Sequence, residues 1–281
     1  MSTDKRFAEI PVEAVKNFWN RCPCNLRHSP APVGTKEYFE EVAKRKFFVE
    51  PHLVDFADFP SVKGKKVLEI GCGLGTTAVR FAMAGAAKVT AVDISEQSLE
   101  LAKQHAAVYG VSDRMEFFLA NAEELSKHIP LDHYDVIFSF GVIHHTPHPD
   151  KIIQELKHFL KRNGKIKIMV YSRYCWKTLW VLFKHGKLKF WNLSKLLAAH
   201  SEAQIGCPVT YTYSRSSGRK LLESHGFKVD RVHVDHIFPY KIAEYVQYKY
   251  VKIWYFRWMP RRLFRWLETK FGWHLCIEAS R

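Results

Sequence analysis

Three histidines lie close together in the segment FSFGVIHHTPHP, residues 138–149, at His144, His145 and His148. Three interpretations are open: a metal site, a general base or substrate contact, and loop histidines bonded to backbone. A metal site is the weakest, because two of the histidines are chain neighbours and a proline interrupts helical spacing to the third. No carboxylate lies within the segment, and we expect no metal ion. Histidine titrates near neutral pH and suits proton removal, so His144 or His145 is a candidate catalytic residue, with His145 favoured.

A glycine-rich segment offers a second kind of chemistry. The sequence EIGCGLG, residues 69–75, ends the apolar run KKVLEI and precedes a helical pattern. Glycines at such a turn let the backbone approach a ligand closely, and the next helix can add N–H donors. Asp93 ends the next apolar run, where a carboxylate can accept hydrogen bonds from both hydroxyls of a ribose. Together these features predict a nucleotide-like ligand.

The residues around this loop favour a cationic ligand over a dinucleotide. The dinucleotide pattern G-x-G-x-x-G fails from Gly71, where Thr76 replaces the last glycine. It passes as G-x-G-x-x-A from Gly73, so the loop alone does not exclude NAD. Glu69 suits a cation and not a pyrophosphate, and the third apolar run leads into Asn121-Ala122-Glu123, polar groups placed for an adenine edge. An ordinary strand–turn–helix explains each feature alone but not the combination.

Apolar runs alternate with helical patterns over about a hundred residues, which predicts a parallel sheet with helices on both faces. A helix is expected over 13–19, and Thr35 can cap another over 35–48. Ser95 caps a third, and Asp150 can cap a fourth that stops at Asn163-Gly164. The strands are expected at 65–70, 88–94, 115–120, 134–140, 165–171, 228–234 and 273–280.

The order of these motifs resembles a known family. VLEIGCGLGTT, VDIS, ANAEEL, YDVIFSFGVIHH and GKIKIMV are similar to successive motifs of class I S-adenosylmethionine-dependent methyltransferases. The resemblance covers about residues 62–171, and more loosely the strands near 232 and 275. It implies an α/β fold with a Rossmann-like seven-stranded sheet, its last strand antiparallel, helices on both faces and helical lid insertions. It also implies S-adenosylmethionine as the cofactor and S-adenosylhomocysteine as the product.

The resemblance assigns the cofactor site residue by residue. Glu69 would lie near the methionine amino group, Asp93 would hold the ribose hydroxyls, and Ile94 would lie against the adenine. Asn121 stands where many relatives have Asp, and its amide oxygen can still accept a hydrogen bond from the exocyclic amine. The implied cofactor-binding residues are Glu69, Gly71, Cys72, Gly73, Gly75, Asp93, Ile94, Asn121, Ala122, Glu123 and Phe140.

The acceptor side is less constrained by the sequence. A sulfonium is a strong methyl donor, so positioning supplies much of the rate, and a base is needed only where the nucleophile carries a proton. Methyltransferases of exocyclic amines often carry Asn/Asp-Pro-Pro-Tyr after the fourth strand; this chain has Ser139-Phe140-Gly141-Val142, which disfavours that class. The catalytic candidates are His145, His144 and Tyr171, and the substrate-binding candidates are Tyr38, Tyr211, Tyr213 and His236, with Arg173 and Asp235 as further polar candidates.

Segments outside the motifs are expected to enclose the substrate. Residues 1–60 are predicted to form an N-terminal helical lid segment, and residues 61–281 the methyltransferase domain. Two insertions, at about 172–214 and 235–272, are predicted to form a substrate cap.

The second insertion is rich in aromatic and basic residues. Tyr248, Val251, Tyr255 and Trp258 align at helical spacing before Pro260, and RRLFRWLETKF reads as a second helix. This composition fits a cap packed on the sheet, a wall of an aromatic or anionic substrate pocket, or a membrane-docking surface. RNA binding is less favoured, because no RNA-binding module is recognisable.

Composition bounds the setting of the protein. The 281 residues carry a formal net charge of +15, which favours an anionic partner: nucleic acid, a membrane surface or an acidic small molecule. The six cysteines are scattered and form no CxxC pair, which indicates a reducing compartment. The N-terminus has no signal-peptide pattern and no run approaches the roughly 18 apolar residues of a membrane span, so a cytoplasmic location is expected.

The sequence thus predicts an S-adenosylmethionine-dependent methyltransferase of a small molecule, with an O, N or C nucleophile and an anionic or aromatic substrate. The alternatives are an RNA or tRNA methyltransferase, a methyltransferase of a membrane-associated lipid or quinone-like substrate, and a non-catalytic cofactor-binding module. Peripheral membrane contact is compatible with the prediction, nucleic acid is a less favoured partner, and the oligomeric state stays open.

Overall fold

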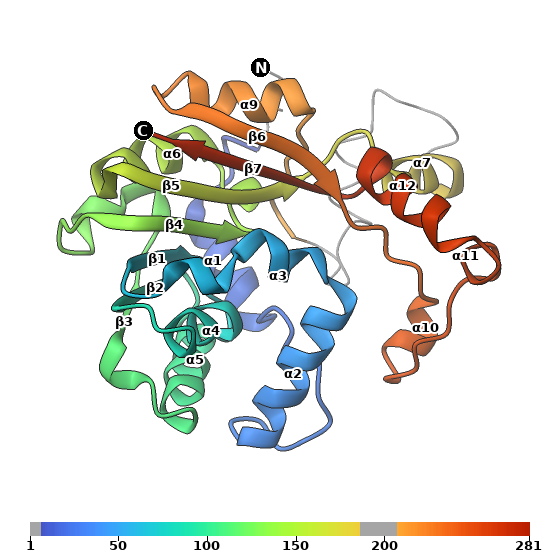
Figure 1. Ribbon diagram of the computed structural model, residues 1–281, viewed down its shortest axis with the longest axis horizontal. Coiled ribbons are helices and arrows are strands. Elements are labelled where there is room, and N and C mark those ends of the chain that lie inside the picture. The colour runs from blue at the N-terminus through green and yellow to red at the C-terminus, as the bar shows by residue number, and fades with distance from the viewer. Residues whose placement is uncertain (1–6, 186–206) are drawn as a thin grey trace.

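The sheet of the computed structural model, which describes residues 7–185 and 207–281, has seven strands in the order β3-β2-β1-β4-β5-β7-β6 (Figure 1). Strands β1 to β5 pair in parallel, and β7 runs antiparallel to both β5 and β6. This confirms the predicted α/β fold and its antiparallel last strand. The strands are β1 (Lys66–Ile70), β2 (Lys88–Asp93), β3 (Met115–Leu119), β4 (Tyr134–Phe140), β5 (Leu160–Tyr171), β6 (Lys228–Asp235) and β7 (His274–Ser280).

Helices cover both faces of this sheet, as predicted. The side chains of β1 alternate: Val67 packs with the helices of one face, whereas Leu68 and Ile70 pack with those of the other. The first face carries α3 (His52–Ala57), α4 (Thr76–Met83) and α5 (Glu96–Val108); the second carries α6 (Pro149–Phe159), α9 (Arg215–Glu223) and part of α1 (Val12–Arg21). The remaining elements are α2 (Lys36–Val49), η1 (Phe59–Val62), η2 (Ser112–Arg114), η3 (Ala122–Lys127), η4 (Ile143–His145), α7 (Trp176–His185), α10 (Ile242–Tyr245), α11 (Trp254–Arg257) and α12 (Arg261–Phe271).

Two of the predicted helix caps are present and one is not. The hydroxyl of Thr35 accepts a hydrogen bond from the Tyr38 N–H at 3.2 Å, and that of Ser95 accepts one from the Ser98 N–H at 3.1 Å. The predicted Asp150 cap is wrong, because α6 begins one residue earlier, at Pro149. Proline suits the first helical position, since its missing N–H would have no partner there. The helix also ends before Asn163-Gly164, which lies inside β5.

The predicted helix over the aromatic stripe from Tyr248 to Trp258 is wrong. The chain instead forms α10, an antiparallel bridge between Tyr240 and Lys252, and α11. Tyr248 has a φ of 63°, a left-handed value that a helix interior does not accept. The ring of Tyr250 packs against those of Tyr240 and Tyr245, so aromatic contacts within the loop replace the helical stripe. The second predicted helix of this insertion is confirmed as α12.

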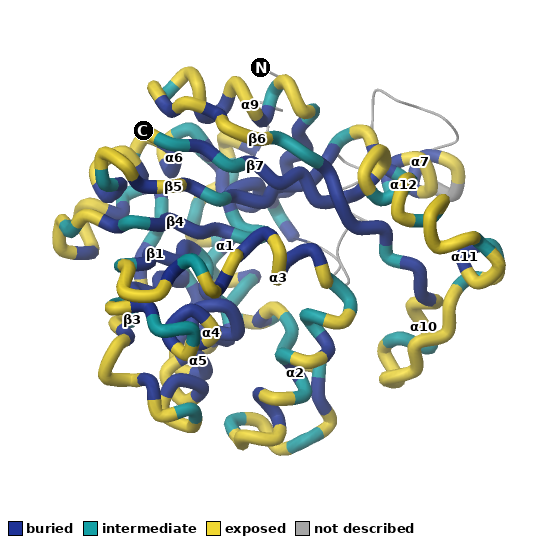
Figure 2. The backbone as a smooth tube through the Cα atoms, in the orientation of Figure 1, coloured by how far each residue is buried: buried dark blue, intermediate teal, exposed yellow. Residues whose placement is uncertain are grey.

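Burial separates the sheet from this insertion. The strands are mostly buried, whereas α10 and α12 have no buried residue (Figure 2). Of the first insertion, α7 is described, and residues 186–206 lie outside the described part. Among the described residues, no helix has the length and apolar character needed to cross a membrane.

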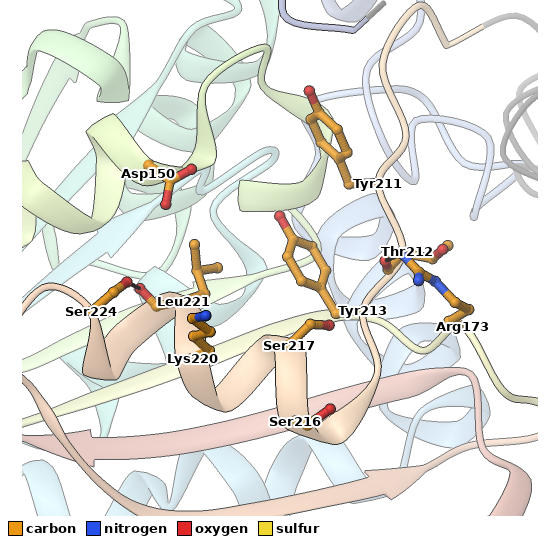
Figure 3. A pocket seen from close by; sticks show the side chains of 10 residues that line it. All are labelled: Asp150, Arg173, Tyr211, Thr212, Tyr213, Ser216, Ser217, Lys220, Leu221 and Ser224. Carbon is orange, nitrogen blue, oxygen red and sulfur yellow. Dashed lines mark hydrogen bonds between the residues drawn. The ribbon is translucent and has the colours of Figure 1, made fainter. Parts of the chain in front are cut away.

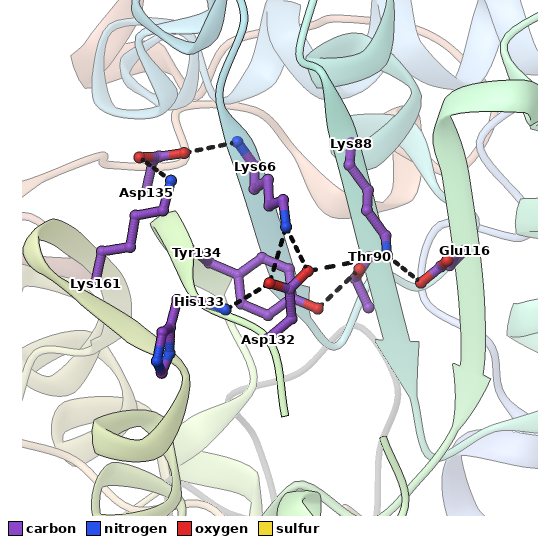
Figure 4. A network of polar contacts seen from close by, with 9 residues as sticks. All are labelled: Lys66, Lys88, Thr90, Glu116, Asp132, His133, Tyr134, Asp135 and Lys161. Atoms are coloured by element: carbon purple, nitrogen blue, oxygen red, sulfur yellow. Dashed lines mark hydrogen bonds and ion pairs between the residues drawn. The ribbon is translucent and has the colours of Figure 1, made fainter. Parts of the chain in front are cut away.

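A polar network closes the amino-terminal edge of the sheet (Figure 4). The Lys66 ammonium donates to both carboxylate oxygens of Asp132, at 2.9 and 2.8 Å, and the Lys66 N–H donates to Asp135. The Tyr134 hydroxyl donates to Thr90 inside the sheet. Ligands of open α/β sheets bind at the opposite edge, where the parallel strands end.

Candidate functional site

A cavity lies at the carboxyl ends of β1, β2 and β4. The strand order reverses at β1, which has β2 on one side and β4 on the other. Ligands of open α/β sheets bind at this point, because the loops leave on opposite faces and open a crevice. The walls come from the glycine loop (Ile70, Gly71, Cys72, Gly73, Leu74), the end of β2 (Val92, Asp93, Ile94), the segment after β3 (Ala120, Asn121, Ala122), the end of β4 and the loop after it (Phe140, Gly141, Val142, His145, Thr146, Pro147), and α1 (Val12, Val15, Trp19).

The three glycines of the loop have different roles. All have positive φ values, 73° at Gly71, 53° at Gly73 and 74° at Gly75. A Cβ on Gly71 would overlap the side chain of Val142, whereas one on Gly73 would have no neighbour within 4 Å. A Cβ on Gly75 would meet Ala102 of α5 at 3.0 Å, and Gly75 does not line the cavity. Gly71 and Gly73 therefore shape the cavity, and Gly75 allows α5 to pack closely.

Asp93 fixes the loop and lines the cavity. One carboxylate oxygen accepts a hydrogen bond from the Gly73 N–H at 2.7 Å, and the other accepts one from the Ser95 N–H at 2.8 Å. Burial raises the pKa of Asp93, while these N–H donors act in the opposite direction. Each oxygen of a carboxylate can accept a second hydrogen bond. The side chain can thus hold the loop and still bind two hydroxyls.

Glu69 is a buried carboxyl group that is not fully hydrogen-bonded. It is the second-last residue of β1, and it lies behind the glycine loop and is not itself among the residues that line the cavity. Only 3% of its surface is exposed, and its Oε2 has no hydrogen-bond partner among the described residues. Burial raises the pKa of Glu69 to about 8, which the charge of Lys46 partly offsets. A buried carboxylate is costly unless a cation or donors pair with it. Glu69 therefore fits a ligand that carries a positive amino group.

The segment after β3 places only part of its predicted residues at the cavity. Asn121 and Ala122 line it, and the Asn121 amide oxygen accepts a hydrogen bond from the Glu123 N–H at 3.0 Å. The Glu123 carboxylate does not line it; it accepts hydrogen bonds from the Thr146 hydroxyl and, at 2.9 Å, from the His148 N–H. Glu123 thereby ties η3 to the histidine segment.

The three histidines of that segment are separated by the fold. His145 lines the cavity, and its Nδ1 lies 2.8 Å from the Val209 carbonyl. A carbonyl only accepts, so Nδ1 carries the proton in this bond and the ring's lone pair is on Nε2. His144 is fully buried, neither of its ring nitrogens has a partner among the described residues, and burial lowers its pKa well below the usual value. His148 precedes α6 and does not line the cavity.

Tyr171 lies behind this segment and does not line the cavity. Its ring centroid is 3.8 Å from that of His144 and 4.2 Å from that of Trp273. His144 and Tyr171 form a packed aromatic layer beneath His145. Of the three predicted catalytic residues, the fold brings one to the cavity and two to the layer that supports it.

Tyr211 and Tyr213 line a second pocket beside α9 (Figure 3). The Tyr211 hydroxyl donates to the carbonyl of Pro147, a residue of the cavity wall, at 3.1 Å. Arg173 donates to the Thr212 carbonyl at 3.0 Å, and burial raises the pKa of Tyr213. The two tyrosines thus lie across a wall from the first cavity.

The other two predicted substrate residues lie elsewhere. Tyr38 is fully buried, and its hydroxyl donates to the Leu26 carbonyl at 2.8 Å. His236 is buried beside His52 and His274, and burial lowers its pKa to about 3. Asp235, a further polar candidate, accepts hydrogen bonds from Arg265 on both carboxylate oxygens, at 2.6 Å each.

Helix α1 contributes a wall of the cavity that was not predicted from the sequence. Val12, Val15 and Trp19 line the cavity, and the Trp19 ring lies 5.4 Å from that of His145. Their spacing of three and four positions is a helical stripe, a signal present in the sequence. The spacing indicates an apolar face of the helix, but not which surface that face lines.

Comparisons with known proteins agree with this geometry. Residues 61–208 match a family model described as a methyltransferase domain. A ubiquinone biosynthesis O-methyltransferase of Neisseria meningitidis serogroup C (strain 053442) is 34% identical over 119 residues, 42% of this chain and 49% of that protein. A 27-O-demethylrifamycin SV methyltransferase of Amycolatopsis mediterranei (strain S699) is 34% identical over 109 residues, 39% of each chain. The chain thus spans about half the length of the first relative and less of the second.

Solved structures extend the likeness over the whole chain, as a likeness of fold. Magnesium protoporphyrin IX methyltransferase from Synechocystis PCC 6803 superposes with a TM-score of 0.60 at 18% identity, covering 96% of this chain and 100% of that one. Geranyl diphosphate C-methyltransferase from Streptomyces coelicolor A3(2) gives a TM-score of 0.60 at 14% identity, covering 98% and 99%.

Proposed function

The chain belongs to the methyltransferase domain family, and from this premise we propose that it transfers a methyl group from S-adenosylmethionine to a small-molecule acceptor. The observation that carries the proposal is the cavity at the strand-order reversal, with Asp93 on its wall and the buried Glu69 carboxyl near the end of β1. An amino acid with a positive amino group, joined to a nucleoside, would supply a cation for Glu69 and ribose hydroxyls for Asp93.

Residues at and beside the cavity have proposed partners on this cofactor. Glu69 would pair with the amino group, and the backbone of Gly71 to Gly73 would follow the ligand chain. Asp93 would accept from the ribose hydroxyls. Ile94, Asn121 and Ala122 would enclose the adenine. When bound, the cofactor supplies a sulfonium-activated methyl group.

The names of the relatives support an oxygen acceptor. One relative is named an O-methyltransferase of ubiquinone biosynthesis, and the other is named for a 27-O position. The wall from α1 is apolar and aromatic, which suits an aromatic or quinone-like acceptor more than a polar nucleic acid. We propose that residues 1–60 and the two insertions enclose this acceptor, with residues 61–281 as the methyltransferase domain. The first of these segments supports the proposal, because Val12, Trp19 and Lys46 line the cavity, whereas no described residue of the insertions does.

A surface feature supports an acceptor drawn from a membrane. Trp254, Trp258 and Trp266 are 72%, 79% and 51% exposed. They alternate with Arg257, Arg261 and Arg262 on α11, α12 and the turn between them. Tryptophan and arginine suit the interface of an anionic bilayer, where the ring enters the headgroup layer and the guanidinium meets phosphate. Peripheral contact here would bring the cavity to an amphiphilic substrate.

His145 is the proposed general base for a hydroxyl acceptor. The Nδ1–H bond to Val209 fixes the ring, and Nε2 can take the acceptor's proton as the methyl is transferred. His145→Ala is expected to slow methyl transfer about 10²–10⁴-fold, the usual contribution of a general base, with unchanged cofactor affinity. His148→Ala is the matched control, because it changes a histidine of the same segment outside the cavity. Single-turnover rates and calorimetry measure the two effects, and unchanged turnover in His145→Ala would return this histidine to a structural role.

The function itself is tested by incubating the protein and methyl-labelled cofactor with fractionated cell extract. Label in the small polar or the lipid fraction supports the proposal, and lipid label favours the membrane-associated acceptor. Label confined to RNA contradicts the small-molecule acceptor. Cofactor binding without any transfer across all fractions supports a binding module instead.

A further inference from the structure

Three potential metal ligands from distant parts of the chain meet beside the cavity. Glu50 lies just after α2, His236 lies just after β6, and His274 begins β7. Each offers one ligand atom, and these atoms lie within 4.8 Å of one another. We propose that Glu50, His236 and His274 bind one divalent transition-metal ion of the zinc class.

The spacing needs only a small adjustment to hold an ion. The His274 Nε2 and a Glu50 carboxylate oxygen are 3.9 Å apart. Two ligands at zinc distances of 2.0–2.1 Å in a tetrahedral site are about 3.4 Å apart. The His236 and His274 ring centroids are 4.6 Å apart, and the three ligand atoms lie within 4.8 Å of one another, so they must approach by at most about 1.4 Å to hold an ion.

The neighbours of the three residues orient them as outer partners orient metal ligands. The His274 Nδ1 lies 2.9 Å from the His52 Nε2. In the tautomer that donates from Nδ1 to His52, the lone pair of His274 is on Nε2, the atom that faces Glu50. Asp235 accepts from the His236 N–H at 2.7 Å, while Arg265 occupies its carboxylate. Asp235 therefore positions His236 and does not compete for the ion.

The donor set selects the class of metal. Two imidazoles and one carboxylate suit zinc and its transition-metal neighbours, whereas calcium and magnesium prefer oxygen ligands throughout. Both histidines are buried, whereas the Glu50 side chain is 22% exposed. Three protein ligands leave a coordination position for water or for an oxygen of another molecule.

The open coordination position of the proposed ion would lie close to the cavity. The His274 ring lies 5.4 Å from the ring of Phe140, which lines the cavity. An ion held here would lie beside the cavity and could bind the acceptor's oxygen, a role that rests on the proposed function. The proposal of a metal site rests on the distances between the three ligands and not on the proposed function.

The test uses the full chain after treatment with a chelator. Titration with Co²⁺, monitored by visible absorption and by displacement with Zn²⁺, is expected to show one ion per chain. Glu50→Gln and His236→Gln should each lower the Co²⁺ affinity at least about 100-fold, since even outer partners of a metal site are worth 10–100-fold. His52→Gln, an outer partner, should lower it less. His233→Gln is the matched control, because His233 lies on β6, three residues before His236, beside Phe56 and outside the three-residue set.

Circular dichroism and thermal unfolding establish that each variant is folded before its affinity is compared. Absence of stoichiometric Co²⁺ binding by the wild type, or equal binding by the folded Glu50→Gln variant, would overturn the metal site. Calorimetry with S-adenosylmethionine on the chelated protein separates the two proposals. Cofactor binding without metal binding removes only the metal site, and metal binding without cofactor binding removes only the proposed function.

Discussion

The Asp93→Ala variant is expected to bind S-adenosylmethionine at least about 100-fold more weakly than the wild type. Hydrogen bonds to a charged group contribute about 1.5–3 kcal/mol each, and the proposed site loses two of them with the ribose. The carboxylate also accepts hydrogen bonds from the N–H groups of Gly73 and Ser95. Its removal should therefore loosen the loop that faces the ligand. Isothermal titration calorimetry at constant salt measures the affinity.

The control for this variant is Glu96→Ala. Glu96 is an exposed carboxylate three positions further along, at the start of α5, and it does not line the cavity. Its removal should leave the cofactor affinity unchanged. Tight binding by a folded Asp93→Ala protein would contradict the ribose assignment.

The Gly71→Ala variant is expected to lose about 2–5 kcal/mol of unfolding free energy, the sum of left-handed strain and overpacking. Gly71 has a φ of 73°, and an added Cβ would overlap one methyl of Val142 and lie 2.8 Å from the other. Val142 is branched and lines the cavity wall, so it cannot rotate away without moving that wall. The same displacement should weaken cofactor binding. Urea unfolding and calorimetry measure the two effects.

Gly110→Ala separates strain from steric conflict. Gly110 has a φ of 64°, close to that of Gly71, but an added Cβ would have no neighbour within 4 Å. Its cost should be about 1–2 kcal/mol, that of left-handed strain alone. Equal destabilisation by the two variants would show that Val142 does not restrict the loop.

The strands and most helices of the fold were predictable because their signals are local. Each strand is an apolar run, and Thr35 and Ser95 cap helices through their own neighbours. The glycine loop and Asp93 were predictable for the same reason, since consecutive strands of a parallel sheet end at one edge. The signal was ambiguous from Tyr248 to Trp258. There the ring of Tyr250 packs against Tyr240 of the same loop and against Phe48 of α2, and these contacts decided the conformation.

The residue types and their short-range spacing in the sequence thus determined the sheet, the glycine loop and the order of the elements. The tertiary structure alone decided which polar residues meet. It placed His145 at the cavity and buried His144, moved Tyr211 and Tyr213 to a second pocket, and gathered Glu50, His236 and His274 into one set. The physical reason is that these neighbours come from separate loops, whose positions depend on how their helices pack on the sheet and not on any local pattern.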